Sequence, residues 1–344
     1  MRRLVPVAAE LGPSFVDALR RAWDDGDAVL PVDPRLPAPA RDALLASMRL
    51  DDDVDDGDAL VVATSGTTGE PKGVVLTHDA VSASATATSA RLDVDPARDR
   101  WLCVLPLAHV GGLSVVTRAL VTGTPLTFDE RDPAATLVSM VATQVRRQDV
   151  SRFRTVVLGG SAPPASLPPN VVTTYGMTET GSGVVYDGVP LDGVEVRAVG
   201  GELQVRGPML LRAYRDGSDP RTADGWLPTG DAGEVMDGRV TVRGRIADVI
   251  VTGGEKVWPD PVEAVLRGVS GVADVAVIGA TDDEWGQRVV ACVVPDGEPP
   301  TLEALRDAVK AVLPAYAAPK QLVLVDAVPR TPLGKVQRRM IRPV

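Results

Sequence analysis

The sequence predicts a multidomain α/β protein with a large N-terminal α/β domain, a β subdomain and a small, mobile α+β C-terminal domain. Three observations support this fold class. The 344 residues exceed what one ordinary core organises. Strand and helix patterns alternate up to about residue 158, and short strands split by glycines then follow over residues 194–242. From residue 260 onward the pattern reads helix, strand, strand, helix, strand.

Composition excludes several classes of protein. The chain is 44% apolar and 24% charged, as in ordinary globular proteins. Its formal net charge of −10 argues against nucleic-acid binding, which needs a basic face. No apolar run reaches the roughly 18 residues of a membrane span, and Pro6 and Glu10 interrupt the N-terminal stretch before signal-peptide length. Cys103 and Cys292 lie far apart without metal-ligand spacing, which suits a reducing cytoplasm.

The first 58 residues predict two helices and an acidic connector. Ser14 is expected to cap a helix in which Phe15, Val16, Leu19 and Trp23 have helical spacing. A second helix is expected over residues 39–50. Six aspartates within residues 51–58 are expected to form a solvated linker that binds no metal.

Further elements are expected in the following order. Strands at residues 59–64 and 73–77 flank a glycine-rich loop, and a helix of small residues follows over 78–90. The α/β pattern continues through residues 101–105, 112–121 and 155–158. In the C-terminal part we expect helices at 260–267 and 302–313, strands at 273–279, 288–294 and 322–325, and a domain boundary near 244–248.

The loop TSGTTGEPKG, residues 64–73, has the composition of a phosphate-binding segment. Glycines let backbone N–H groups approach an anion, hydroxyl side chains add donors, and Lys72 adds charge. It is not a P-loop, because Lys72 is followed by Gly73 and not by a hydroxyl residue, and because the loop joins two strands. Taken alone, the segment has a flexible turn as its alternative interpretation.

Four further motifs follow in order: YGMTET at residues 175–180, WLPTGDA at 226–232, GRIAD at 244–248 and PRTPLGK at 329–335. Together with the loop they resemble the adenylate-forming superfamily of acyl-CoA synthetases, luciferases and nonribosomal-peptide adenylation domains. The resemblance implies a large N-terminal domain over residues 1–244, abbreviated at its start, a hinge at 245–248 and a small mobile domain over 249–344. Relatives commonly have Asp, Lys or Ser at the hinge position that is Ala247 here.

The resemblance also implies a two-step reaction with ATP, Mg²⁺ and coenzyme A. A carboxylate attacks the α-phosphate of ATP to give an acyl-AMP, and a thiol then displaces AMP. Because two anions meet in the first step, positive charge is needed, and Lys335 occupies the position of the adenylation lysine. Glu179 would supply a hard oxygen ligand to Mg²⁺, with Thr178 beside it for the α-phosphate.

The same resemblance assigns the nucleotide and coenzyme A contacts. Individually, each of these residues would be an ordinary turn or surface residue. Asp231 and Arg245 would bind the ribose hydroxyls, and Tyr175 could stack on the base. The other nucleotide contacts would be Thr64, Ser65, Gly66, Thr67, Thr68, Gly69, Lys72, Gly160, Ser161, Ala162, Gly176 and Met177, and those to coenzyme A would be Gly253, Gly254, Lys256 and Trp258.

The segment from Trp101 to Ser114, WLCVLPLAHVGGLS, resembles the o-succinylbenzoate-CoA ligases of menaquinone biosynthesis. It would place His109 at the acyl pocket as a catalytic and substrate-binding residue, although a structural role is the alternative for a lone histidine. Gly112, Ser161 and Gly176 would line the substrate site, and Arg118 and Ser161 are candidates for a second substrate carboxylate. His78 is expected to be structural.

The sequence therefore predicts a cytoplasmic ligase whose partners are a small carboxylic acid, ATP and coenzyme A. Relatives usually have far more sequence than 63 residues before the phosphate loop, and the shortening suggests an exposed surface that a homodimer would cover. The alternatives are another acyl- or aryl-CoA ligase, an adenylation domain that loads a carrier protein, and a non-catalytic nucleotide-binding protein derived from the enzyme.

Overall fold

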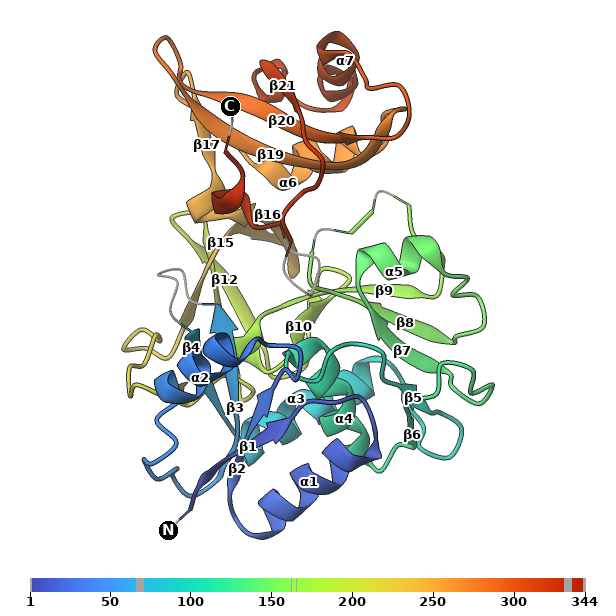
Figure 1. Ribbon diagram of the computed structural model, residues 1–344, viewed down its shortest axis with the longest axis vertical. Coiled ribbons are helices and arrows are strands. Elements are labelled where there is room, and N and C mark those ends of the chain that lie inside the picture. Colours follow the sequence, from blue (N-terminus) through green and yellow to red (C-terminus); the bar gives the residue numbers. More distant parts are fainter. Residues whose placement is uncertain (1, 66–70, 162, 165, 331–335, 343–344) are drawn as a thin grey trace. The chain divides into compact units, whose positions relative to one another are not determined.

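The N-terminal part of the chain forms a mixed β-sheet (Figure 1). The computed structural model describes residues 2–65, 71–161, 163–164, 166–330 and 336–342. The first sheet has the order β1-β2-β3-β4-β14, in which β1 to β3 run parallel and β4 is antiparallel to both neighbours. Its strands are β1 (Leu4–Ala8), β2 (Ala28–Val32), β3 (Asp58–Ser65), β4 (Pro71–Thr77) and β14 (Ala213–Tyr214), with α1 (Pro13–Asp24) and α2 (Ala38–Ser47) as connections.

Two expectations for the N-terminal segment need correction. Helix α1 begins at Pro13 after Gly12 and has no side-chain cap, so Ser14 is not its cap. Proline is favoured in the first helical turn because its missing N–H would lack a partner there anyway. Asp58 is not a solvated linker residue: it begins β3, is 2% exposed and accepts hydrogen bonds from Arg212 at 2.8 and 2.9 Å. The other five aspartates of the connector are exposed, as predicted.

The second sheet has the order β11-β10-β9-β8-β7-β5-β6. Helices α3 (His78–Arg91) and α4 (Val110–Thr122) pack against each other; α3 contacts β3, β4 and β10, while α4 contacts β5 and β7, so the pair lies between the two sheets (Figure 1). Its strands are β5 (Trp101–Leu102), β6 (Leu126–Thr127), β7 (Leu137–Met140), β8 (Thr155–Leu158), β9 (Val171–Gly176), β10 (Gly183–Tyr186) and β11 (Val189–Pro190), and α5 (Ala142–Arg147) follows β7.

The glycine-split region forms a third sheet, as predicted, with the order β12-β13-β15-β16. Strands β15 and β16 are antiparallel. The chain divides into two units, and the division falls within this stretch of sequence. The strands are β12 (Glu195–Val199), β13 (Glu202–Arg206), β15 (Leu227–Met236) and β16 (Arg239–Arg245). Unit 1 comprises Met1–Gly160, Leu167–Val196 and Val205–Pro228, and unit 2 comprises Ser161–Ser166, Arg197–Gln204 and Thr229–Val344.

Most of unit 2 is a sheet with the order β18-β17-β20-β19, in which β21 pairs with β20. Apolar residues of two helices, including Leu266 and Leu305, bury one face of this sheet. The elements are β17 (Ile250–Thr252), β18 (Glu255–Val257), α6 (Pro259–Leu266), β19 (Val272–Asp282), β20 (Gly286–Pro295), α7 (Leu302–Val312) and β21 (Gln321–Leu324). The predicted C-terminal α+β pattern is therefore confirmed. In the described part of the chain, no helix has the length and apolar character to cross a bilayer.

A cluster of charged side chains attaches Arg338, near the C-terminus, to the rest of unit 2. Glu263 of α6 is 1% exposed and accepts hydrogen bonds from the Val277 N–H at 2.9 Å, from Arg338 at 2.7 Å and from Arg267 at 2.9 Å. Arg338 also pairs with Asp248, at 3.1 Å, and with Asp260. Burial raises the pKa of Glu263 against the opposing effect of Arg338. The cluster is stable only while each buried charge keeps its partners.

Replacing Arg338 should therefore destabilise unit 2. Arg338→Ala leaves the Glu263 carboxylate short of a counter-charge and is expected to lower the unfolding free energy of unit 2 by about 3 to 5 kcal/mol. Hydrogen exchange of the β19 and β20 amides measures this loss of unfolding free energy in unit 2 alone. Unfolding of the whole chain would be harder to interpret, because a chain of two units need not unfold in a single two-state transition. The matched control is Arg243→Ala, whose ion pair with Glu234 has side chains 50% and 42% exposed and should contribute less than about 1 kcal/mol.

Candidate functional site

Two groups of the predicted site residues lie together in the structure, one group in each unit. The group in unit 1 surrounds the turn after β9. That turn is η1 (Thr178–Thr180), and Thr180 holds it by donating to the Met177 carbonyl at 2.9 Å and by accepting from the Met177 N–H at 2.9 Å. Gly176 is needed before it, because an added Cβ would lie 2.2 Å from the Ser182 carbonyl oxygen. This close approach requires glycine whether or not Gly176 also contacts a ligand.

Glu179 is held at two points. Its backbone carbonyl accepts from the Leu211 N–H at 2.8 Å, and its Oε1 accepts from the Tyr214 hydroxyl at 2.9 Å. Burial, followed by the negative charge of Glu179, raises the pKa of Tyr214, so its hydroxyl stays protonated and donates. Thr178 precedes Glu179 in the turn and is partly buried. Sequence reasoning missed Tyr214, which no motif singled out.

Lys72 lies over the ring of Tyr214. It is in β4, in register with Thr64 of β3, and its Nζ lies 4.8 Å from the ring centroid of Tyr214. The predicted hairpin is thus confirmed, and it brings Thr64 and Lys72 to the same end of the two strands. The predicted contacts Gly66, Thr67, Thr68 and Gly69 lie outside the described residues, as does the side chain of Ser65.

The group in unit 2 is the pair Asp231 and Arg245. The two residues are register partners across β15 and β16, and Arg245 Nε lies 3.0 Å from Asp231 Oδ1. Arg245 Nη1 also donates to the Thr229 carbonyl at 2.8 Å, and the Thr229 hydroxyl accepts from the Asp231 N–H at 3.1 Å. The carboxylate of Asp231 is thus buried beside its counter-charge. Such a pair presents both an acceptor and donors to a diol.

His109 is placed before the first turn of α4, as its N-cap residue. Its Nε2 is buried and has no hydrogen-bond partner among the described residues. Burial lowers the pKa of His109; the negative charge of Asp33 opposes this shift, and the positive charge of Arg35 adds to it. Gly112 has a packing explanation, because an added Cβ would lie 2.2 Å from the Leu105 carbonyl oxygen.

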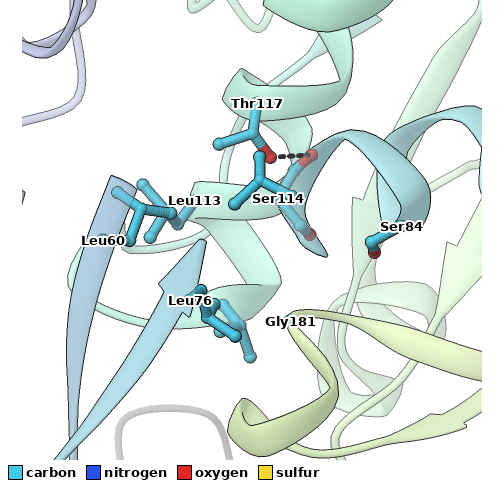
Figure 2. Close-up of a pocket in the computed structure, with 9 residues that line it drawn as sticks. Leu60, Leu76, Ser84, Leu113, Ser114, Thr117 and Gly181 are labelled. Atoms are coloured by element: carbon cyan, nitrogen blue, oxygen red, sulfur yellow. Dashed lines mark hydrogen bonds between the residues drawn. The ribbon is translucent and has the colours of Figure 1, made fainter. Parts of the chain in front are cut away.

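A small cavity lies beside α4 (Figure 2). It offers about 10 Å³, which is barely room for one water molecule and none for an aryl acid. Figure 2 shows labelled lining residues from α4, with Ser114 and Thr117, and from the two strands that carry Leu60 and Leu76, as well as Gly181, which follows η1. The lining residues are Leu60, Leu76, Val81, Ser84, Val110, Leu113, Ser114, Thr117 and Gly181.

Arg118, on α4, carries a buried charge. It is 3% exposed, and its Nη2 donates to the hydroxyls of Ser114, at 3.1 Å, and Ser182. Its guanidinium carbon lies 5.4 Å from the ring centroid of Trp101. Its Nε and Nη1 are buried without a hydrogen-bond partner, and it has no ion pair with any described carboxylate. A buried cation of this kind is costly unless a ligand supplies the missing acceptors.

The remaining predicted residues are more exposed or lie outside the description. Gly160 and Ser161 are exposed after β8, and Tyr175 is partly buried in β9. Gly253, Gly254 and Lys256 are exposed at the turn and strand of the β17–β18 hairpin, while Trp258 is the N-cap residue of α6. Ala247 lies in the short helix Ile246–Asp248. Ala162 and Lys335 lie outside the described residues.

The donor set around Glu179 fits a magnesium ion, which is a hard cation with few protein ligands. Among the described residues no three His, Cys, Asp or Glu side chains gather as a metal cluster. Mg²⁺ usually binds through one or two carboxylates together with substrate phosphates and water. Oε1 of Glu179 accepts from Tyr214, and no other hydrogen bond to its carboxylate is found within the described residues. Within the described residues the second oxygen therefore has no partner and would be available to a cation.

Comparison with known proteins identifies relatives of both the N-terminal and the C-terminal part of the chain. Residues 25–215 match the family described as AMP-binding enzyme, and residues 261–335 match the family described as AMP-binding enzyme C-terminal domain. The chain is 38% identical over 377 aligned residues to a Mycobacterium tuberculosis protein named probable 2-succinylbenzoate-CoA ligase, covering 98% of this chain and 97% of that protein.

Two solved structures are similar in fold and sequence. Escherichia coli MenE, bound to an analogue of OSB-AMS, has a TM-score of 0.77 and 28% identity, covering 94% of this chain and 84% of that one. Bacillus subtilis o-succinylbenzoate CoA synthetase, in complex with the acyl-adenylate intermediate OSB-AMP, has a TM-score of 0.78 and 26% identity, covering 99% and 83%. These findings confirm the resemblance and the fold class predicted from the motifs.

The burial of His109 predicts its titration. Because burial disfavours the imidazolium, the pKa of His109 should lie below the ordinary value of about 6.5. A depressed pKa means that stability is complete above the unfolded-state pKa and is lost as pH falls through the folded-state value. The chain has two histidines, so NMR titration of the imidazole C–H signals, assigned with His78→Gln, measures both. A midpoint for His109 at or above 6.5 would contradict the buried neutral imidazole.

Proposed function

The chain belongs to the AMP-binding enzyme family, and from that premise we propose that it is an ATP-dependent ligase that joins o-succinylbenzoate to coenzyme A. In the first step a carboxylate oxygen of the acid attacks the α-phosphorus, an acyl–O–P bond forms, and pyrophosphate leaves. In the second step the coenzyme A thiolate attacks the acyl carbon, a thioester forms, and AMP leaves. The observation that carries the proposal is the 38% identity to a probable 2-succinylbenzoate-CoA ligase across nearly the whole of both chains.

The predicted site residues would have distinct roles in the first step. Asp231, which accepts, and Arg245, which donates, suit the two ribose hydroxyls of the nucleotide. Lys72 and Thr64 suit the phosphates, with Thr178 at the α-phosphate. A magnesium ion on Glu179 would neutralise phosphate charge and so reduce repulsion of the incoming carboxylate. Lys335 would bridge carboxylate and phosphate, which brings positive charge to the developing anion.

The substrate assignment gains support from Arg118. o-Succinylbenzoate carries a second carboxylate beyond the one that is adenylated. Two buried nitrogen atoms of Arg118 have no partner in the part of the chain that the structure describes, and a carboxylate would satisfy both the charge and the open donors. The helix that carries Arg118 also carries Ser114 and begins after His109. His109 and Gly112 would then lie at the acyl group, with Ser161 and Gly176 as further substrate contacts.

The other predicted features extend this proposal. The segment 245–248 would act as the hinge about which residues 249–344 turn between the two steps, bringing Gly253, Gly254, Lys256 and Trp258 to coenzyme A for the second. ATP and coenzyme A are cytoplasmic reactants, which supports a cytoplasmic site of action. A homodimer stays a prediction that the molecular mass in solution would test.

A substrate panel tests the function. Purified protein with ATP, Mg²⁺ and coenzyme A should release AMP with o-succinylbenzoate well above the rate with benzoate, long-chain fatty acids or no acid. Release with another acid alone would support a different acyl- or aryl-CoA ligase. ATP binding with no acid-dependent release of pyrophosphate would support the non-catalytic alternative.

Lys335→Ala should separate the two half-reactions. Losing one preorganised donor costs about 10² to 10³ in rate, so pyrophosphate release from ATP and acid should fall by that factor. Thioester formation from supplied acyl-AMP should be nearly unchanged, because AMP leaves in that step without an attack on phosphorus. Equal losses in both half-reactions would remove Lys335 from the adenylation step.

Arg118→Lys should lower discrimination for the dicarboxylic acid. Lysine keeps the charge but loses the planar set of donors, so about one charged hydrogen bond is lost. The ratio of kcat/KM for o-succinylbenzoate to that for a related monocarboxylic aryl acid should fall about 10- to 100-fold. Activity with the monocarboxylic acid serves as the internal control for folding. A ratio equal to that of the unmodified enzyme would contradict the role of Arg118.

A further inference from the structure

We propose that Tyr214 is a positioning residue that holds the metal-binding carboxylate and the phosphate-binding lysine apart, each toward the nucleotide. The proposal rests on the proposed function in one respect, because that function makes Glu179 the magnesium ligand and Lys72 a phosphate contact. Tyr214 itself touches neither substrate nor metal in this scheme. Its two contacts are on opposite parts of one side chain: the hydroxyl on Glu179 and the ring face on Lys72.

The hydroxyl selects one of the two carboxylate oxygens. Tyr214 donates to Oε1 of Glu179 at 2.9 Å, so that oxygen already carries a hydrogen bond. Outer hydrogen bonds of this kind orient metal-ligating carboxylates, and their loss commonly weakens metal binding about 10- to 100-fold. The hydrogen bond would leave Oε2 for the cation and would fix the carboxylate plane before the cation arrives.

The ring restrains the lysine by a different interaction. The ammonium of Lys72 lies 4.8 Å from the centroid of the Tyr214 ring, within the range of a cation–π contact. Lysine is a point charge on a flexible stem, and without the ring it could swing to the nearest carboxylate. Lys72 and Glu179 form no ion pair among the described residues, so neither charge is neutralised by the other.

The backbone around Tyr214 makes this placement rigid. Tyr214 pairs with Val74 in β4, two residues after Lys72, and Leu211 donates to the Glu179 carbonyl at 2.8 Å. Arg215, the residue after Tyr214, donates its N–H to the Gly73 carbonyl at 2.7 Å, and its guanidinium donates to the Met48 carbonyl at 3.1 Å. The chain on either side of Tyr214 is therefore attached to β4, and just before β14 it is also attached, through Leu211, to the turn that carries Glu179.

Two variants separate the two contacts. Tyr214→Phe removes the hydroxyl and keeps the ring, whereas Tyr214→Leu removes both. The matched control is Tyr186→Phe, because Tyr186 is a buried tyrosine whose hydroxyl is 3.2 Å from Thr88 in the same unit. Circular dichroism and thermal unfolding establish that each variant is folded before binding is measured.

Binding of Mn²⁺ and of ATP supplies readouts that do not depend on the acid. Electron paramagnetic resonance of Mn²⁺ with saturating ATP should show affinity for the ion falling about 10-fold or more in Tyr214→Phe and unchanged in Tyr186→Phe. Equilibrium dialysis of ATP in EDTA should show unchanged affinity in Tyr214→Phe and weaker binding in Tyr214→Leu. Unchanged Mn²⁺ affinity in Tyr214→Phe, or metal-free ATP affinity equal in the two Tyr214 variants, would overturn the proposal.

The failure of this inference and the failure of the proposed function give different results. If o-succinylbenzoate is not a substrate but Tyr214→Phe weakens Mn²⁺ binding, the acid is wrong and the role of Tyr214 stands. If o-succinylbenzoate is ligated and Tyr214→Phe binds Mn²⁺ normally, only the role of Tyr214 fails. If the unmodified protein with ATP binds no Mn²⁺ that Glu179→Gln removes, the metal role of Glu179 and the role of Tyr214 both fail.

Discussion

The pairing of β4 with β3 on one side and β14 on the other is the interaction on which the group in unit 1 depends. It places Lys72 opposite Thr64 and brings Tyr214 beside Val74. The chain before β14 is bonded in turn to the Glu179 carbonyl. Because hydrogen-bonded ladders leave little freedom along the strand, the groups proposed to bind phosphate and metal lie on a stiff support.

Two buried arginines show how differently one charge can be accommodated. Arg338 is surrounded by Asp248, Asp260 and Glu263, which satisfy its charge and explain it as structural. Arg118 is more deeply buried but contacts only hydroxyls and an aromatic ring, and two of its nitrogens have no acceptor among the described residues. A folded chain retains such an uncompensated charge at a cost to stability, and the proposed role of Arg118 in binding a second substrate carboxylate would account for it.

The sequence predicted elements best where the signal was local. The hairpin of β3 and β4 and the strand Thr155–Leu158 follow from apolar runs bounded by turn residues, and they lie where expected. The predicted start of α1 was wrong. Pro13 is suited to the first helical turn and Ser14 to an N-cap, and composition does not decide which of the two residues sets the start of the helix. Asp58 was misread because its partner Arg212 is 154 positions away, and an aspartate run by itself looks solvated.

The sequence by itself determined the family, the order of the motifs and the residue types that the chemistry needs, since these depend on spacing along the chain. Only the tertiary structure showed that Arg118 is buried with open donors and that Tyr214 contacts both Glu179 and Lys72. The physical reason is that burial and ring contacts arise between strands and helices distant in sequence. A lone tyrosine or arginine carries no mark of the neighbours that packing will bring to it.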